Sequence, residues 1–220
     1  MAHRILRRLL LSTGIALAAG SGAANAQSLG GNLLFLIQEG AGGSTGGNTL
    51  TLDQSNALGT RLAGSEDGLL PALQSGGGNT ADVLMEGADG RLSLSQVNTG
   101  GALGRGNEAF AVIGGASIGE LIQSGQGNVA DLTIFSVPGL LPGSGRIEQE
   151  GSSNIASLRV EGAGASGQIS QMGDANIMTL EVEGAGTSGT VIQTGNGNGT
   201  TGTVRVISNG ETVRIVQRGF

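Results

Sequence analysis

Short runs in which apolar and polar residues alternate recur along most of the chain. After Asn154, for example, apolar side chains fall at every second position, at Ala156, Leu158 and Val160. An aliphatic residue also stands two positions before several of the recurring Gln residues. A period of two over so few residues is typical of a β-strand with one buried face. The pattern therefore predicts an all-β chain.

A repeat of about 22 residues underlies this alternation. Gln149, Gln171 and Gln193 follow one another at intervals of 22 residues, and the pattern Q-x-G-x-x-N at these positions also occurs at Gln74 and Gln123. Each copy is expected to form strand, tight turn, strand, tight turn, with Gly-Ala-Gly stretches in the second turn. A lone hairpin has nothing against which to bury its apolar face. The copies are therefore predicted to stack into an amyloid-like β-solenoid, with about 4.8 Å between layers.

Stacking also accounts for amide side chains at inward positions. A buried amide without a partner costs about 1–3 kcal/mol. In a parallel stack, each side-chain carbonyl accepts a hydrogen bond from the amide of the next copy. The alternative is that these residues are exposed at turns. The predicted amide ladder, which we expect to support assembly, comprises Gln38, Gln74, Asn79, Gln96, Gln123, Asn128, Gln149, Asn154, Gln171, Asn176, Gln193, Asn198 and Gln217.

The repeats form one predicted domain, residues 27–220, without an internal domain boundary. They are regular over 121–220 and irregular over 27–120. In the irregular part, Gly, Ser and Thr residues delay the Asn that should follow Gln38 and Gln96. Gln54 either opens a repeat of its own or closes the one begun at Gln38.

Two longer segments interrupt the alternation. Residues 58–70 and 135–143 are predicted to be loops that bulge from the stack. The second of them contains two of the three Pro residues of the chain, which do not fit inside a sheet.

Residues 1–26 have the features of a cleaved export signal. Three Arg precede a short apolar stretch at 9–19, and Ala-Asn-Ala at 24–26 forms an A-x-A site before Gln27. The apolar stretch is too short to span a bilayer, although a plain membrane anchor is the alternative. We therefore expect residues 27–220 to be secreted, without membrane insertion.

Composition restricts the kind of core and the kind of partner. The chain has 44 Gly but no Cys, Trp or Tyr, so the core must be built from aliphatic side chains. With 38% hydrophobic and 13% charged residues, the chain is too apolar for typical disorder. A net charge of −6 argues against a nucleic-acid partner, which needs clustered cations. The absence of Cys excludes disulfides and thiolate metal sites.

Catalytic chemistry has few candidate groups. Without residues 1–26, the chain has no His, Cys, Tyr or Lys, so that triads, Schiff bases and zinc sites lack their side chains. We therefore predict that it is not an enzyme and binds no cofactor. The adjacent acids Glu66 and Asp67 could in principle act as an acid/base pair, but a solvated loop is the preferred interpretation. Calcium is the remaining metal alternative, yet no segment has the G-G-x-G-x-D pattern of calcium-binding β-rolls.

Glu161 and Glu183 occupy equivalent repeat positions. Stacked like charges repel one another. These acids are therefore predicted to face water, where they either provide solubility or act as gatekeepers that slow premature assembly.

The motif Q-x-G-x-x-N-x-A resembles the curlin repeat of bacterial curli subunits. Gln74, Gln123 and Gln149 begin the best matches, and the resemblance covers most of residues 30–220. Two later copies replace the Ala, with Met178 and Thr200. The family's Ser before the Gln has no consistent counterpart, and its second Gln occurs only as Gln54, so the interior is more aliphatic than in the family.

The resemblance implies a structural subunit, or a nucleator, of extracellular curli-like amyloid fibres that act in surface adhesion and biofilm matrix. It implies self-assembly, other curlin subunits as partners, and export through an outer-membrane curli secretion machinery. The segment 213–220 carries Arg residues and ends after the first strand of a repeat. In these two respects it is similar to the minor subunit of the curli family. Its open edge is expected to template the next molecule.

Two other classes of function remain. The alternative is a non-polymerising β-solenoid that acts as an adhesin or glycan-binding surface protein. A β-helical enzyme acting on polysaccharide is a more remote possibility.

Overall fold

The structure, a computed structural model, describes residues 23–29, 31–40, 47–100, 104–136, 141–199, 203–207 and 209–219. Regular secondary structure in these ranges consists of strands, and they contain no helix of the length and apolarity needed to cross a membrane. Of the predicted export signal, residues 1–22 lie outside the described residues. Its last four residues belong to the first strand, β1, which crosses the predicted cleavage site.

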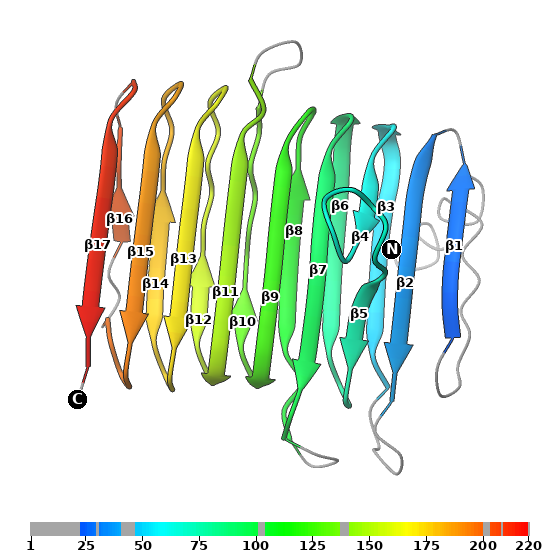
Figure 1. Ribbon diagram of the computed structural model, residues 1–220, viewed down its shortest axis with the longest axis horizontal. Coiled ribbons are helices and arrows are strands. Elements are labelled where there is room, and N and C mark those ends of the chain that lie inside the picture. Colours follow the sequence, from blue (N-terminus) through cyan, green and yellow to red (C-terminus); the bar gives the residue numbers. More distant parts are fainter. Residues whose placement is uncertain are drawn as a thin grey trace, which may run out of the picture.

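The strands form two sheets that lie face to face and extend along the long axis of the molecule (Figure 1). Sheet A has ten strands: β1 (Ala23–Leu29), β2 (Asn32–Glu39), β4 (Arg61–Ala63), β5 (Ala72–Ser75), β7 (Arg91–Asn98), β9 (Ile118–Gln126), β11 (Ser144–Ser152), β13 (Ser166–Met172), β15 (Ser188–Thr194) and β17 (Thr212–Arg218). Sheet B has seven strands: β3 (Thr49–Leu58), β6 (Thr80–Ala88), β8 (Glu108–Ile113), β10 (Val129–Ala130), β12 (Ile155–Ser157), β14 (Ile177–Glu181) and β16 (Thr203–Arg205).

The chain alternates between the sheets, so that successive turns of the solenoid stack in sequence order. Neighbouring strands in both sheets are parallel, and the pairing of β1 with β2 is the only antiparallel one among the described strands. In the regular part, repeat positions lie directly over one another: Gln149 of β11 pairs with Gln123 of β9 and with Gln171 of β13. The predicted all-β solenoid of stacked strand-turn-strand repeats is confirmed.

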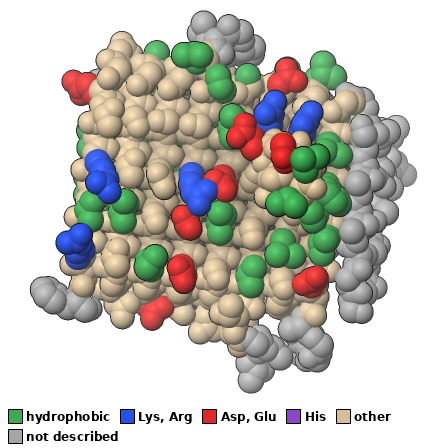
Figure 2. Space-filling model, viewed as in Figure 1, with side chains coloured by type: hydrophobic (Ala, Val, Ile, Leu, Met, Phe, Trp, Pro, Cys, Tyr) green, Lys and Arg blue, Asp and Glu red, His purple; other side chains and the backbone are tan. Residues whose placement is uncertain are grey.

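The core lies between the sheets and is aliphatic. Inward and outward residues alternate along each strand, as in β13, and the fully buried side chains include Leu121, Ile147, Leu158 and Ile169. On the face shown in Figure 2, charged side chains are few, and small groups of Arg lie beside acidic side chains. The alternation in the sequence therefore reports which side chains are buried.

A column of buried glycines makes this core asymmetric. Gly119, Gly145, Gly167 and Gly189 pair in register at an inward position of sheet A. Leucine side chains from the opposite side of the core fill the space next to them: a Cβ added at Gly167 would lie 2.5 Å from Cδ1 of Leu158, which follows β12. Glycine at this position thus lets the two sides of the core approach each other, a role that differs from the turn role expected of the Gly-Ala-Gly stretches.

The glycine of the Q-x-G-x-x-N motif is required for a different reason. At Gly151, φ is +114°, and an added Cβ would lie 2.1 Å from the carbonyl oxygen of Gly173 in the next turn. The residue before the Asn also has positive φ, but there a side chain fits, as at Ser153 and Ala175. The motif therefore encodes a corner at which consecutive backbones are in contact.

The first predicted loop, residues 58–70, is partly wrong. β3 continues to Leu58, and β4 occupies Arg61–Ala63. β4 and β5 both pair with β2 and β7, so they are two halves of one layer of sheet A, and the chain bulges out between them. Alternation over only three residues was too short to reveal β4. Of the second predicted loop, residues 137–140 lie outside the described residues.

We expect opposite effects from two substitutions at neighbouring corners. Gly151→Ala should lower the free energy of unfolding by about 2–3 kcal/mol, because the φ of this residue is unfavourable for alanine and the added Cβ would clash with the backbone of the next turn. Ala175→Gly should raise it by about 0.5–1 kcal/mol, because glycine removes the strain of a left-handed alanine (φ 55°). Denaturant unfolding of the monomeric chain measures both values. Equal stability of the two variants would contradict this account of the corner.

Candidate assembly site

The predicted Gln residues form one continuous ladder on the inner face of sheet A. Each Nε2 donates to Oε1 of the Gln in the following layer, from Gln38 at one end to Gln217 at the other. The donor–acceptor distances along the ladder are 2.6, 2.8, 2.9, 2.9, 2.9, 2.8 and 2.7 Å. The six Gln residues between the two ends are essentially inaccessible to water. They are therefore not exposed turn residues.

The same side chains also connect the two sheets. Gln149 Nε2 donates to the carbonyl oxygen of Val129 in sheet B at 3.0 Å, and Gln171 Nε2 donates to that of Ile155 at 3.0 Å. Each Gln therefore links its own layer to the next layer in sheet A and to the preceding layer in sheet B. Because both amide hydrogens have acceptors, burial leaves no unsatisfied donor.

The Asn residues form a second ladder at the corner between the sheets. Asn154 Nδ2 donates to Asn128 Oδ1 at 3.1 Å, and the Asn154 backbone N–H donates to the same oxygen at 3.1 Å. Asn154 Nδ2 also donates to the carbonyl oxygens of Glu150 and Gly173, which closes the turn. The same contact to the preceding Asn recurs at Asn79, Asn107, Asn128, Asn176 and Asn198.

The two ladders run in opposite directions. In the Gln ladder, Nε2 points toward the C-terminal end of the stack, whereas in the Asn ladder Nδ2 points toward the N-terminal end. The dipoles of neighbouring columns are therefore antiparallel, which is the favourable arrangement for dipoles side by side. Each end of the stack consequently presents one donor column and one acceptor column.

All thirteen predicted ladder residues lie in these two columns. The prediction omitted two members, Asn48 and Asn107, which complete the Asn ladder at its irregular end. Their signal was present, since each follows a Gln of the other ladder, but inserted residues lengthen the spacing. Gln54 lies in β3, so it closes the turn that begins at Gln38.

Gln54 is the exception among the buried amides. Its Nε2 donates to Thr60 Oγ1 at 2.8 Å, but its buried Oε1 accepts no hydrogen bond from the described residues. It begins an otherwise aliphatic column that continues at Met85. Because the next residue in this column is not an amide, no side-chain N–H group lies above Gln54 from which its Oε1 could accept a hydrogen bond.

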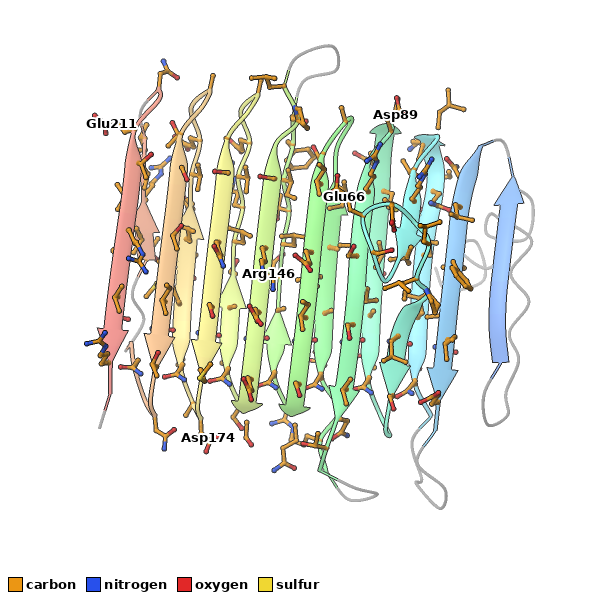
Figure 3. The ribbon with its side chains drawn as sticks, viewed as in Figure 1. Glu66, Asp89, Arg146, Asp174 and Glu211 are labelled. Carbon is orange, nitrogen blue, oxygen red and sulfur yellow. The ribbon has the colours of Figure 1, made fainter. Side chains whose placement is uncertain are left out.

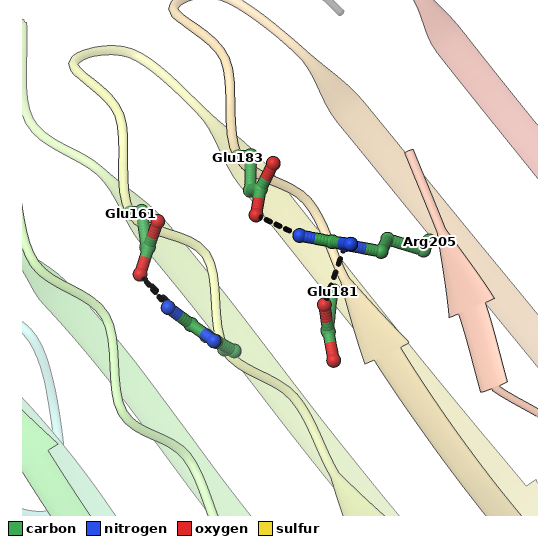
Figure 4. Close-up of polar contacts among 5 residues, drawn as sticks. Glu161, Glu181, Glu183 and Arg205 are labelled. Carbon is green, nitrogen blue, oxygen red and sulfur yellow. Dashed lines mark hydrogen bonds and ion pairs between the residues drawn. The ribbon is translucent and has the colours of Figure 1, made fainter. Parts of the chain in front are cut away.

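The stacked acids are compensated by arginines. Glu161 and Glu183 lie in register, as their repeat positions predict. Arg159 pairs with Glu161, and Arg205 lies between two acids, with Nη2 2.6 Å from Glu183 Oε1 and Nε 2.9 Å from Glu181 Oε2 (Figure 4). The hydrogen bond to Glu183 raises the pKa of Arg205, so this cation stays charged. Repulsion between the two stacked acids is thus reduced within one molecule.

The acidic side chains are dispersed. Glu66 lies on the loop that crosses sheet A, whereas Asp89, Asp174 and Glu211 lie at turns at the two edges of the stack (Figure 3). Hydrogen bonds from the Ser65 hydroxyl and the Leu69 N–H hold the pKa of the Asp67 carboxyl below its usual value, which is the wrong direction for a general acid. In the described ranges, no three His, Cys, Asp or Glu side chains are close enough together to hold a metal ion.

Comparison with known proteins adds no relative, since no protein-family model, no curated protein and no solved structure matches the chain. What the site can do therefore follows from its own geometry. It offers no nucleophile or proton carrier in the ladders, but it offers repeated, directional hydrogen bonds along one axis.

The contribution of the ladder to stability can be measured by replacing Gln with Leu at three positions, each in a separate variant. Gln149→Leu should lower the free energy of unfolding by about 2–4 kcal/mol, because it leaves Gln123 Nε2 and Gln171 Oε1 without their ladder partners. Gln168→Leu, at an outward position of β13, should change it by less than about 0.5 kcal/mol.

Gln54→Leu provides a buried control. It removes a carbonyl that already lacks a partner, so the free energy of unfolding should fall by less than about 1 kcal/mol or should rise. Denaturant unfolding under conditions that keep the chain monomeric compares the three variants. If Gln149→Leu were no worse than Gln54→Leu, the ladder would have no special role in stability.

Proposed function

We propose that the chain is an exported structural subunit, or nucleator, of extracellular curli-like fibres that act in surface adhesion and biofilm matrix. The observation that carries this proposal is that both amide ladders run the length of the described stack, and that the Gln ladder ends in half-buried members, Gln38 in β2 and Gln217 in the edge strand β17. A second copy placed on the β17 end would continue the Gln ladder without any change at that end, whereas at the β2 end the paired β1 would first have to be removed.

The edges of the sheets support the same proposal. In the described part of the chain, no strand pairs with the outer side of β3, β16 or β17. Soluble repeat proteins cover such ends with polar caps, because an unpaired edge is a template for another strand. Here the outermost layer keeps inward aliphatic residues, Val213 and Ile215, in the pattern of the interior.

The resemblance to curlin repeats supplies the remaining parts of the proposal. Residues 1–26 would direct export and be removed, and an outer-membrane curli secretion machinery would deliver residues 27–220 to the cell surface. Other curlin subunits would join the same fibre.

One observation favours the alternative of a monomeric glycan-binding adhesin. A shallow groove on the outer face of sheet A is lined by polar side chains that include Ser144, Arg146, Gln168 and Thr190. Hydroxyl, amide and guanidinium groups in a row suit the hydroxyl groups of a sugar chain. The groove is open and lacks the aromatic side chains that commonly stack on sugar rings, so fibre formation remains the better-supported function.

Purified chain 27–220 should form fibres that bind thioflavin T and diffract at about 4.8 Å and about 10 Å, the spacings between strands and between sheets. Ile169→Pro, which removes a backbone donor from the middle of β13, should abolish fibre formation, whereas Ile169→Val should not. A chain that stays monomeric and thioflavin-negative at high concentration would disprove the proposal. Saturable glycan binding by that monomer would establish the alternative.

A further inference from the structure

The opposite directions of the two ladders decide which ends of two molecules fit together. At the β17 end, Gln217 Nε2 and Asn198 Oδ1 have no hydrogen-bond partner among the described residues, so this end presents a donor column and an acceptor column. At the β2 end, Gln38 Oε1 is the matching acceptor. If two β17 ends met face to face, the Gln donor of one would face the Gln donor of the other. If a β17 end meets a β2 end, the Gln donor faces a Gln acceptor.

Resting on the proposed function, we propose that one copy docks its β16–β17 layer on the β2–β3 layer of a second copy, in the parallel register that places Gln217 over Gln38. This is the register of every interior layer. It places the inward Ile215 over Leu36 in the half of β2 that removal of residues 1–26 frees. The same register places Val213 over Leu34 once Gln27 has also left β2. The interface therefore has the same aliphatic and amide columns as the core.

Charge complementarity independently supports this register. With Gln217 over Gln38, the next residue, Arg218, lies over Glu39, and both side chains are exposed in the single chain. Within the described ranges, Arg218 has no acidic partner, and the Glu39 carboxylate accepts a hydrogen bond only from the Ser75 hydroxyl, at 3.3 Å. Arg214 correspondingly lies over the ring of Phe35, where a guanidinium is stabilised by the aromatic face.

Sheet B provides a second pair of opposite charges at the junction, and the alignment of the Gln residues in sheet A does not by itself determine this pair. The strand pairings of sheet B place Leu180 and Val204 in the column that begins at Leu52. The neighbouring column therefore places Arg205 of one copy over Asp53 of the next. Basic side chains gather at the end of the molecule where β17 lies (Figures 1 and 2), so a junction between two such ends would bring like charges together.

β1 occupies part of the same edge. Its antiparallel pairing places Ala23 opposite Gln38 and Ala26 opposite Phe35. Removal of residues 1–26 would take away the partners of residues 35–38 and would open this half of β2, whereas Gln27, Ser28 and Leu29 would still pair with residues 32–34. The docking is therefore a property of the chain 27–220, and the uncleaved chain should dock more slowly.

Charge reversal at the two ends of chain 27–220 tests the register. Arg218→Glu alone, or Glu39→Arg alone, places like charges at every junction, so the elongation rate from preformed seeds should fall about three- to tenfold at low salt. The double variant should return to within about twofold of the unsubstituted chain. Arg105→Glu, at an exposed site away from both ends, is the matched control and should grow at the unsubstituted rate.

Mixing the two single variants provides a sharper test. Neither chain pairs well with itself, but each end of the Arg218→Glu chain is complementary to an end of the Glu39→Arg chain, so an equimolar mixture should elongate faster than either alone. Residues 39 and 218 lie at opposite ends of one molecule, so an effect within a single chain does not produce this rescue.

The outcomes separate the register from the proposed function. If the unsubstituted chain forms fibres but the single variants grow normally, or neither the double variant nor the mixture is rescued, the register is wrong and the fibre function stands. If the unsubstituted chain forms no fibres, the proposed function and the register both fail.

Discussion

Burial of carboxamide groups between two sheets is the constraint on which the rest of this structure depends. An amide that loses water without gaining partners costs about 1–3 kcal/mol, and the interior contains amides in nearly every layer. Parallel stacking in register supplies a partner to each, as between Gln149 and Gln171 at 2.9 Å. Slipping one strand by a single residue would turn its inward side chains outward and break the ladder as well as the core. The amides therefore fix the register more strictly than aliphatic residues alone.

This constraint acts on layers and leaves the connections between them free. Gln38 and Gln74 are 36 residues apart, whereas Gln149 and Gln171 are 22 apart, yet both pairs are hydrogen-bonded at comparable distances. Insertions such as the bulge between β4 and β5 lie outside the sheets, where water satisfies the backbone. Sequence regularity is consequently a poor measure of structural regularity in the first half of the chain.

Sequence patterns predicted the parts of the structure that each residue type determines by itself. Alternation identified the strands of the regular half, and Gln at inward positions identified the ladder. The role of Gly145 and Gly167 was missed, because glycine has no side chain whose pattern reveals burial, and only the leucines on the opposite side of the core show why it is required. Asn48 and Asn107 were left out of the predicted ladder, although the sequence shows each as the delayed Asn of the repeat that begins at Gln38 or Gln96. The orphan carbonyl of Gln54 depends on which residue lies in the next layer, which local patterns do not reveal.

The same physics gives the stack no internal reason to stop. An interior layer is stabilised by a copy of itself on either side, and the outermost described layers keep the same inward residues. Water can hydrogen-bond to the half-buried amide of Gln217 at the end of a single chain, so the open end of the ladder costs less than a buried amide without a partner. Burying that amide against another molecule adds the aliphatic contacts of a whole layer, while the charges at the two edges select the orientation. Since every junction would resemble the interior, the rate at which matching ends meet, rather than the stability of any one junction, should limit growth.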